Sequence, residues 1–145
     1  MIYLDTYDAP VGALSLASDG PHLCGLWLDG QKYYEEKLEQ RVGAAGDEAS
    51  ALTRLAGSEA RAAAPGLQAA VAWLDRYFDG DPLPVATLPL KPGGTPFQQR
   101  VWKLLADIPY GELRTYAELA AQIACDCGGK ASARAVGTAN GRNPI

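Results

Sequence analysis

The segment TYAELAAQIACDCGGKASARAVGTANGRNPI, residues 115–145, decides the fold of the C-terminal part of the chain. Thr115 followed by Glu118 predicts a capping box, in which each side chain bonds the backbone N–H of the other residue. This capping box opens a helix that we expect to run to about residue 124. A second helix of small residues is expected over 132–140, with a glycine-containing turn between the two. The segment therefore predicts a helix-turn-helix.

The helix that precedes this segment begins with the same device. Thr95 is the expected N-cap, Pro96 the first helical residue and Gln98 the reciprocal capping residue. Pro109 ends the helix, because proline removes a backbone donor and clashes with the preceding turn. Apolar side chains at helical spacing form its buried stripe: Val101, Leu104, Leu105 and Ile108. The C-terminal module is thus expected to be mostly α-helical and similar to a winged helix.

The N-terminal part reads differently. The runs IYLDTYD, VGALSLAS and HLCGLWLD are short, apolar-rich and separated by turn residues, so they predict an antiparallel meander. Residues 43–66 are rich in Ala and Gly and predict a mobile loop or a loosely held helix without much function. A helix ending at Gly80 follows, with one apolar face made of Leu67, Ala70, Val71, Leu74, Tyr77 and Phe78.

The proline-rich stretch DPLPVATLPLKPGG is expected to link two modules. The predicted fold class is α+β: an N-terminal α/β domain over 1–90, with a small antiparallel sheet and a helix, and a helical DNA-binding domain over 91–145. At 145 residues, of which 48% are hydrophobic, the chain can bury a core for each module. Its start does not resemble a secretory signal and no stretch resembles a membrane span, so we expect a cytoplasmic protein with no membrane association.

Charge is distributed unevenly along the chain. Residues 1–90 carry 6 Lys and Arg against 13 Asp and Glu, whereas residues 91–145 carry 7 against 4. A basic segment on an acidic protein is a weak indication of nucleic-acid binding, because phosphates respond to the local field. An uneven surface charge without any ligand remains an equally good interpretation at this point.

The small side chains of the helix over 132–140 call for a physical reason. Gly137 costs helix stability, about 1 kcal/mol relative to alanine, so something should pack against it or approach it closely. One interpretation is helix-on-helix packing through small residues. The other is a helix slim enough for the minor groove of DNA, about 6 Å wide, with Arg134 as the long side chain that reaches the bases.

Three cysteines, Cys24, Cys125 and Cys127, are most simply reduced thiols. Cys125 and Cys127 are expected in the turn between the last two helices, where two thiols without a nearby histidine make a weak zinc pattern. Cys24 is expected in a strand, and His22 beside it is expected to be a surface residue. We predict no metal site and no cofactor.

The order FQQRVW, IPYGELRTYAELA and SARAVGTANGRNPI resembles the O6-alkylguanine-DNA alkyltransferases, or methylated-DNA–protein-cysteine methyltransferases. SDGPHLCGLWLDGQKYY and WLDRYFDGDP resemble the N-terminal domain of the bacterial branch. The resemblance implies a monomeric DNA-repair protein whose helix-turn-helix enters the minor groove of double-stranded DNA containing O6-alkylguanine. It also implies that the base is flipped out and that a cysteine takes the alkyl group irreversibly, in a single turnover.

The resemblance gives individual residues a role. Arg134 corresponds to the arginine that fills the gap left by the flipped base, and Tyr116 to the tyrosine that crowds the phosphate of the target nucleotide. Asn143 corresponds to the asparagine that supports the turn carrying the reactive cysteine. Other expected DNA-binding residues are Thr115, Ser132, Ala135 and Gly137. From the residues alone, Tyr116 could equally be a half-buried aromatic, Arg134 a phosphate contact and Asn143 a turn former.

Two departures from the family pattern bear on activity. The segment between Tyr116 and Arg134 is a few residues longer than in short family members, which we expect to lengthen the turn. In the family, Asn-Pro-Ile is followed by Pro-Cys-His-Arg, which holds the acceptor thiol and its base, whereas the printed sequence stops at Ile145. The expectation is a truncated and inactive alkyltransferase. A non-catalytic binder of alkylated DNA is the alternative, and a helix-turn-helix regulator is disfavoured because its recognition helix would carry longer polar side chains.

Overall fold

The structure, a computed structural model, describes residues 2–30, 54–127 and 129–145. The chain divides into two compact units, which we call the sheet unit and the helical unit. The sheet unit comprises Met1–Leu83, Thr87–Gly93 and Pro144–Ile145. The helical unit comprises Pro84–Ala86 and Gly94–Asn143.

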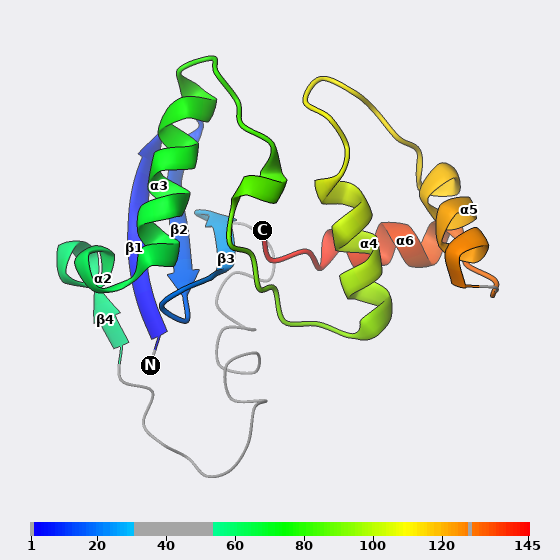
Figure 1. Ribbon diagram of the computed structural model, residues 1–145, viewed down its shortest axis with the longest axis horizontal. Helices are drawn as coiled ribbons and strands as arrows, with labels where there is room; N and C mark the ends of the chain where they lie inside the picture. Colours follow the sequence, from blue (N-terminus) through cyan, green and yellow to red (C-terminus); the bar gives the residue numbers. More distant parts are fainter. Residues whose placement is uncertain (1, 31–53, 128) are drawn as a thin grey trace, which may run out of the picture. The chain divides into compact units, whose positions relative to one another are not determined.

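Three antiparallel strands form most of the sheet unit (Figure 1): β1 (Ile2–Ala9), β2 (Gly12–Ser18) and β3 (Leu23–Leu28). This confirms the predicted meander. A fourth strand, β4 (Arg54–Ala56), was not predicted, and it pairs with β1 in parallel, so that the sheet order is β3-β2-β1-β4. β4 lies within the Ala-rich segment, of which residues 43–53 fall outside the described residues.

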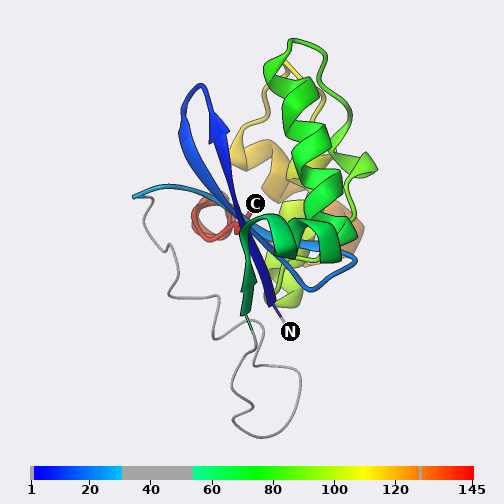
Figure 2. The same ribbon diagram turned by 90° about the vertical axis from the view of Figure 1, so that its left-hand side faces the viewer.

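Two helices follow β4, and the longer one lies on one face of the sheet (Figures 1 and 2): α2 (Gly57–Ala63) and α3 (Pro65–Phe78). The core between α2, α3 and the strands consists of Leu14, Leu16, Leu23, Ala60, Ala64, Leu67, Ala70 and Leu74. Three members of the predicted helix face, Leu67, Ala70 and Leu74, are buried, whereas Tyr77 is 37% exposed. The Ala-rich segment therefore contributes to the core, contrary to the expectation of a loop.

The stretch predicted to be a linker is partly built into the sheet. After a 3-10 turn, η1 (Val85–Thr87), its backbone runs beside β3: Leu23 N–H donates to Pro89 over 2.7 Å and Lys91 N–H donates to Leu23 over 2.9 Å. Leu26 N–H donates over 2.7 Å to the carbonyl of Pro144. The outer edge of β3 explains this difference, because backbone donors and acceptors at a sheet edge need partners.

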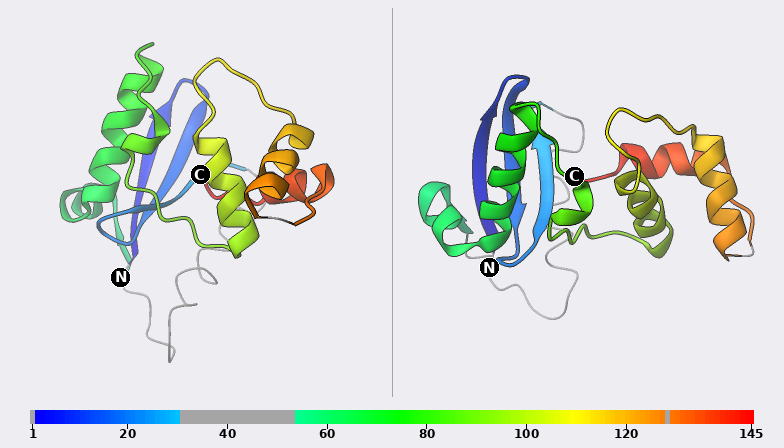
Figure 3. Two further views of the ribbon diagram at one scale, coloured as in Figure 1. Left: turned by 45° about the vertical axis from the view of Figure 1, so that its right-hand side comes forward. Right: turned by 45° about the horizontal axis from the view of Figure 1, so that its top comes forward.

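The helical unit consists of three helices (Figure 3): α4 (Pro96–Ala106), α5 (Tyr116–Cys127) and α6 (Ala133–Gly141). They share a buried cluster made of Val101, Trp102, Leu119, Ala120, Ile123, Val136 and Ala139. The capping box of α4 is present as predicted, with Gln98 N–H bonded to the hydroxyl oxygen of Thr95 and Thr95 N–H bonded to the amide oxygen of Gln98.

The expected position of α5's end is wrong by one turn. The helix continues to Cys127, so Cys125 and Cys127 lie in its last turn and not in the inter-helix turn. The Gln122 amide donates to the Asp126 carboxylate over 3.0 Å, an i to i+4 bond that supports this last turn. The additional residues between Tyr116 and Arg134 thus lengthen the helix. In the described part of the chain, no helix combines the length and apolar character that crossing a membrane requires.

Candidate nucleic-acid interface

Side-chain caps set the starts of α5 and α6. The hydroxyl oxygen of Thr115 accepts from Glu118 N–H over 3.1 Å, and the Glu118 carboxylate accepts from Thr115 N–H over 2.9 Å. The predicted second capping box is therefore present. Ser132 caps α6, since its hydroxyl oxygen accepts from Ala135 N–H over 3.1 Å. Thr115 and Ser132 thus fix where the two helices begin, and Ser132 remains exposed.

Gly137 is explained by the ring of Tyr116. A Cβ atom at Gly137 would lie 3.0 Å from Cε2 and 3.2 Å from Cδ2 of that ring, closer than ordinary van der Waals contact. The structure therefore supports helix-on-helix packing as one reason for the glycine. Asn140 also contacts this tyrosine, because its Nδ2 donates to the Tyr116 hydroxyl oxygen over 3.1 Å. The sequence interpretation missed Asn140, which lies one turn beyond Gly137.

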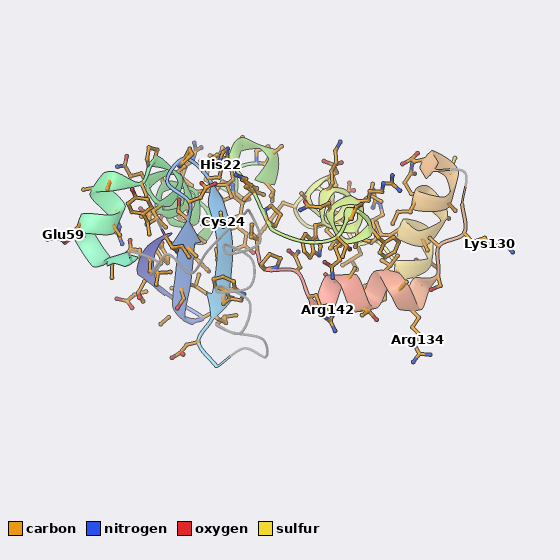
Figure 4. All side chains as sticks on the ribbon, turned by 90° about the horizontal axis from the view of Figure 1, so that it is seen from below. His22, Cys24, Glu59, Lys130, Arg134 and Arg142 are labelled. Atoms are coloured by element: carbon orange, nitrogen blue, oxygen red, sulfur yellow. The ribbon has the colours of Figure 1, made fainter. Side chains whose placement is uncertain are left out.

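A groove of about 480 Å³ separates the start of α4 from α6. Its polar lining consists of Thr95, Gln98, Ser132, Arg134, Thr138 and Arg142, and its apolar lining of Phe97, Ala135 and Ala139. Three of the predicted residues, Ser132, Arg134 and Ala135, therefore meet at one surface. Figure 4 shows Arg134 extending from α6 into open space, away from α4 and α5.

The groove is basic. Arg134 and Arg142 both line it and, among the described residues, no acidic side chain does. Arg134 is exposed and forms no ion pair with any carboxylate in the described part of the chain. Such a surface, beside the N-terminus of a helix, attracts phosphate groups. Arg142 was not among the predicted residues, although its spacing of eight from Arg134 places both on one helix face.

Asn143 follows α6 directly. Its backbone N–H donates to the Asn140 carbonyl over 3.1 Å, as in a turn that ends a helix, and the residue is half-buried. Pro144 after it is fully buried. Asn143 thus lies at the point where the backbone leaves the helical unit and enters the sheet unit.

The described cysteines are not paired with the histidine. The Cys24 thiol faces the carbonyl oxygen of His22 over 3.9 Å, while the His22 ring points to Asp19, with Nδ1 3.2 Å from Oδ1. Burial raises the pKa of the Cys24 thiol, and the Asp19 carboxylate raises it further. Cys125 is exposed on α5. Within residues 2–30, 54–127 and 129–145, no three His, Cys, Asp or Glu side chains converge to form a metal site.

Two family models match the chain. The model described as 6-O-methylguanine DNA methyltransferase, ribonuclease-like domain, matches residues 2–92. The model described as 6-O-methylguanine DNA methyltransferase, DNA binding domain, matches residues 96–145, which include α4, α5 and α6. The groove with Arg134 and the Tyr116 contact both lie within the second match.

Individual relatives agree. The methylated-DNA–protein-cysteine methyltransferase of Mycobacterium tuberculosis is 39% identical over all of this chain and 73% of its own length, and the constitutive enzyme of Bacillus subtilis is 33% identical over 75% of its length. The crystal structure of Mycobacterium tuberculosis OGT in complex with DNA is similar to this structure with a TM-score of 0.70, at 39% identity over 99% of this chain and 72% of the other. The chain therefore belongs to the 6-O-methylguanine DNA methyltransferase family, whose members are DNA-repair alkyltransferases.

Proposed function

We propose that this chain recognises double-stranded DNA containing O6-alkylguanine through the minor groove, with α6 as the inserted helix. The groove lined by Arg134 and Arg142, without an acidic side chain among its described lining residues, is the observation that carries this proposal. The outward residues of α6 are short apart from the arginines, as a helix in a groove about 6 Å wide requires.

In this proposal, residues on α5 and α6 divide the work of base flipping. Arg134 enters the base stack when the target nucleotide leaves it, and Tyr116 presses on the phosphate of that nucleotide. Extruding a base costs a few kcal/mol, which a side chain that refills the stack partly offsets. Thr115, Ser132, Ala135 and Gly137 form the surface that follows the backbone, and Asn143 supports the turn after α6.

The proposal also covers organisation and location. Residues 1–90 serve as the N-terminal α/β domain and residues 91–145 as the DNA-binding domain, and the protein acts as a cytoplasmic monomer without cofactor or metal. Light scattering after size exclusion, with and without a short duplex, tests the monomer. A mass of two chains on one duplex would contradict it.

The experiment that tests the function compares Arg134→Ala with Arg100→Ala. Both variants remove one exposed arginine from the helical unit, but Arg100 lies on α4 and does not line the groove. Fluorescence anisotropy with duplexes that contain guanine or O6-methylguanine measures affinity, and a 2-aminopurine next to the lesion reports flipping. We expect affinity to fall steeply with salt, and flipping to fall only in Arg134→Ala. Equal flipping by both variants would contradict the role of Arg134.

A further inference from the structure

Tyr116 is held against α6 by two separate contacts. It is the first residue of α5, and its side chain is 44% exposed. The absent side chain of Gly137 leaves the space in which the ring lies, with Cε2 and Cδ2 3.0 and 3.2 Å from where a Cβ would be. Asn140 Nδ2 donates to the phenol oxygen over 3.1 Å.

The two contacts restrict different parts of the side chain. Gly137 and Asn140 are three residues apart and therefore lie on the same side of α6. The first contact bears on the edge of the ring, and the second on the oxygen at its tip. Together they select one orientation of the phenol before any DNA arrives. Ordering of this kind raises affinity for a bound state by reducing the freedom that binding must remove.

The direction of the hydrogen bond has a chemical consequence. A phenol oxygen can accept a hydrogen bond and donate its own proton at the same time. Because the Asn140 amide donates to this oxygen, the O–H proton is left to donate elsewhere. A phosphate oxygen, which only accepts, fits this remaining proton.

We infer that Asn140 and Gly137 are positioning residues for Tyr116, which set its phenol so that the O–H donates to the phosphate of the flipped nucleotide. The inference rests on the proposed function, since it assumes that Tyr116 acts on that phosphate. It adds residues that act through the tyrosine and without contact to DNA.

The test is a double-mutant cycle on the 145-residue chain, with an O6-methylguanine duplex carrying an adjacent 2-aminopurine. Asn140→Ala should lower the flipping equilibrium about threefold to tenfold, the cost of freeing one side chain, and leave affinity for unmodified duplex within about twofold. In the Tyr116→Phe background, which has no phenol oxygen, the same change should have no effect. Gln122→Ala, which removes an amide from the surface of α5 that bonds only Asp126 there, is the matched control and should not alter flipping.

Two further variants separate positioning from a structural role. Asn140→Asp replaces the donor with an acceptor, so the phenol proton turns toward the carboxylate, and flipping should fall further than in Asn140→Ala. Gly137→Ala improves helix propensity but intrudes on the ring, so it should lower flipping without lowering the melting temperature of the protein. If Asn140→Ala does not fold, Gly137→Ala still provides the test.

The outcomes distinguish this inference from the proposed function. If the unaltered chain gives no flipping signal, or Tyr116→Phe leaves that signal unchanged, the proposed function fails first. If Tyr116→Phe lowers flipping but Asn140→Ala and Gly137→Ala do not, only the inference is overturned. An equal loss from Asn140→Ala with and without the phenol oxygen would also overturn it, as would a parallel loss of affinity for unmodified duplex.

Discussion

Trp102 on α4 donates a hydrogen bond from its indole Nε1 to the carbonyl oxygen of Ala139 on α6, over 2.8 Å, and both residues are buried. The bond joins the helix that begins at the groove to the helix that carries Arg134. Ala139 also accepts from the backbone N–H of Arg142 over 3.2 Å. The placement of the groove therefore depends on an interaction inside the helical unit.

Replacing Trp102 with Phe should destabilise the helical unit. The change removes the indole donor and some buried volume, with an expected loss of about 1–3 kcal/mol in the free energy of unfolding. Urea unfolding followed by far-ultraviolet circular dichroism measures it. Trp73→Phe is the matched control, because it removes a 3.1 Å indole bond to the Leu83 carbonyl in the sheet unit. DNA affinity should fall for Trp102→Phe only, and an equal loss in both would contradict the coupling of α4 to the groove.

The ion pair between Asp5 and Arg61 should stabilise the sheet unit. The Asp5 side chain is 6% exposed and retains only the Thr6 N–H, at 2.8 Å, as a printed partner when the guanidinium is removed. Arg61→Met should therefore cost about 1–3 kcal/mol of unfolding free energy, since a nearly buried carboxylate loses its counter-charge. Arg76→Met breaks the Arg76–Asp81 pair, which is half exposed or more on both sides, and should cost less than about 1 kcal/mol. Equal costs would show that burial of Asp5 contributes nothing.

Asp19 should make the stability of the sheet unit depend on pH in the acid range. Burial alone would raise its pKa, but hydrogen bonds from the His22 backbone, the Lys91 ammonium and the His22 ring outweigh burial and bring the pKa below the usual 3.8. A lowered pKa means that the unfolded chain binds more protons, so the contribution is complete above pH 3.8 and is lost as pH falls through the folded value. Urea midpoints of the unaltered chain and Asp19→Asn should differ at pH 5 and converge toward pH 2. A gap that widens on acidification would have the wrong sign.

The elements that could be predicted from sequence depend on near neighbours. The capping boxes of Thr95 with Gln98 and Thr115 with Glu118 involve residues three apart, and the strands of the meander adjoin along the chain. Their determinants lie within one short window. The helix-turn-helix could be predicted for the same reason.

What could not be predicted depends on distant partners. β4 is three residues long, and it is a strand because β1 has a free edge more than fifty residues earlier in the sequence. The bond from Leu26 to Pro144 likewise joins opposite ends of the chain. In the candidate site, Gly137 indicated a close approach, but neither the Tyr116 ring nor Asn140 could be assigned to it without the fold.

Thiol reactivity should differ between the described cysteines. Cys125 is exposed, whereas Cys24 is half-buried and its thiol pKa is raised by burial and by the Asp19 charge. Because the thiolate is the reactive form, a maleimide should modify Cys125 much faster than Cys24 at pH 7. Mass spectrometry of peptides from a Cys127→Ser variant follows each site separately. Faster modification of Cys24 would contradict its assignment as an inert thiol, and Asp19→Asn should increase its rate.

The 145-residue chain should bind alkylated DNA without accepting the alkyl group. Transfer requires a thiolate with an adjacent base, and the chain has a single histidine, His22, whose ring is directed to Asp19 while the Cys24 thiol faces the His22 backbone. Duplex carrying radiolabelled O6-methylguanine should therefore leave no label on the protein after hours of incubation, although anisotropy shows it bound. The Mycobacterium tuberculosis relative, 39% identical, is the positive control for the labelled DNA. One equivalent of label on the chain would contradict this expectation, and Cys24→Ser, Cys125→Ser and Cys127→Ser variants would then identify the acceptor. Binding without transfer would match the non-catalytic alternative for this polypeptide, because recognition by α6 and chemistry at a thiol are separate steps.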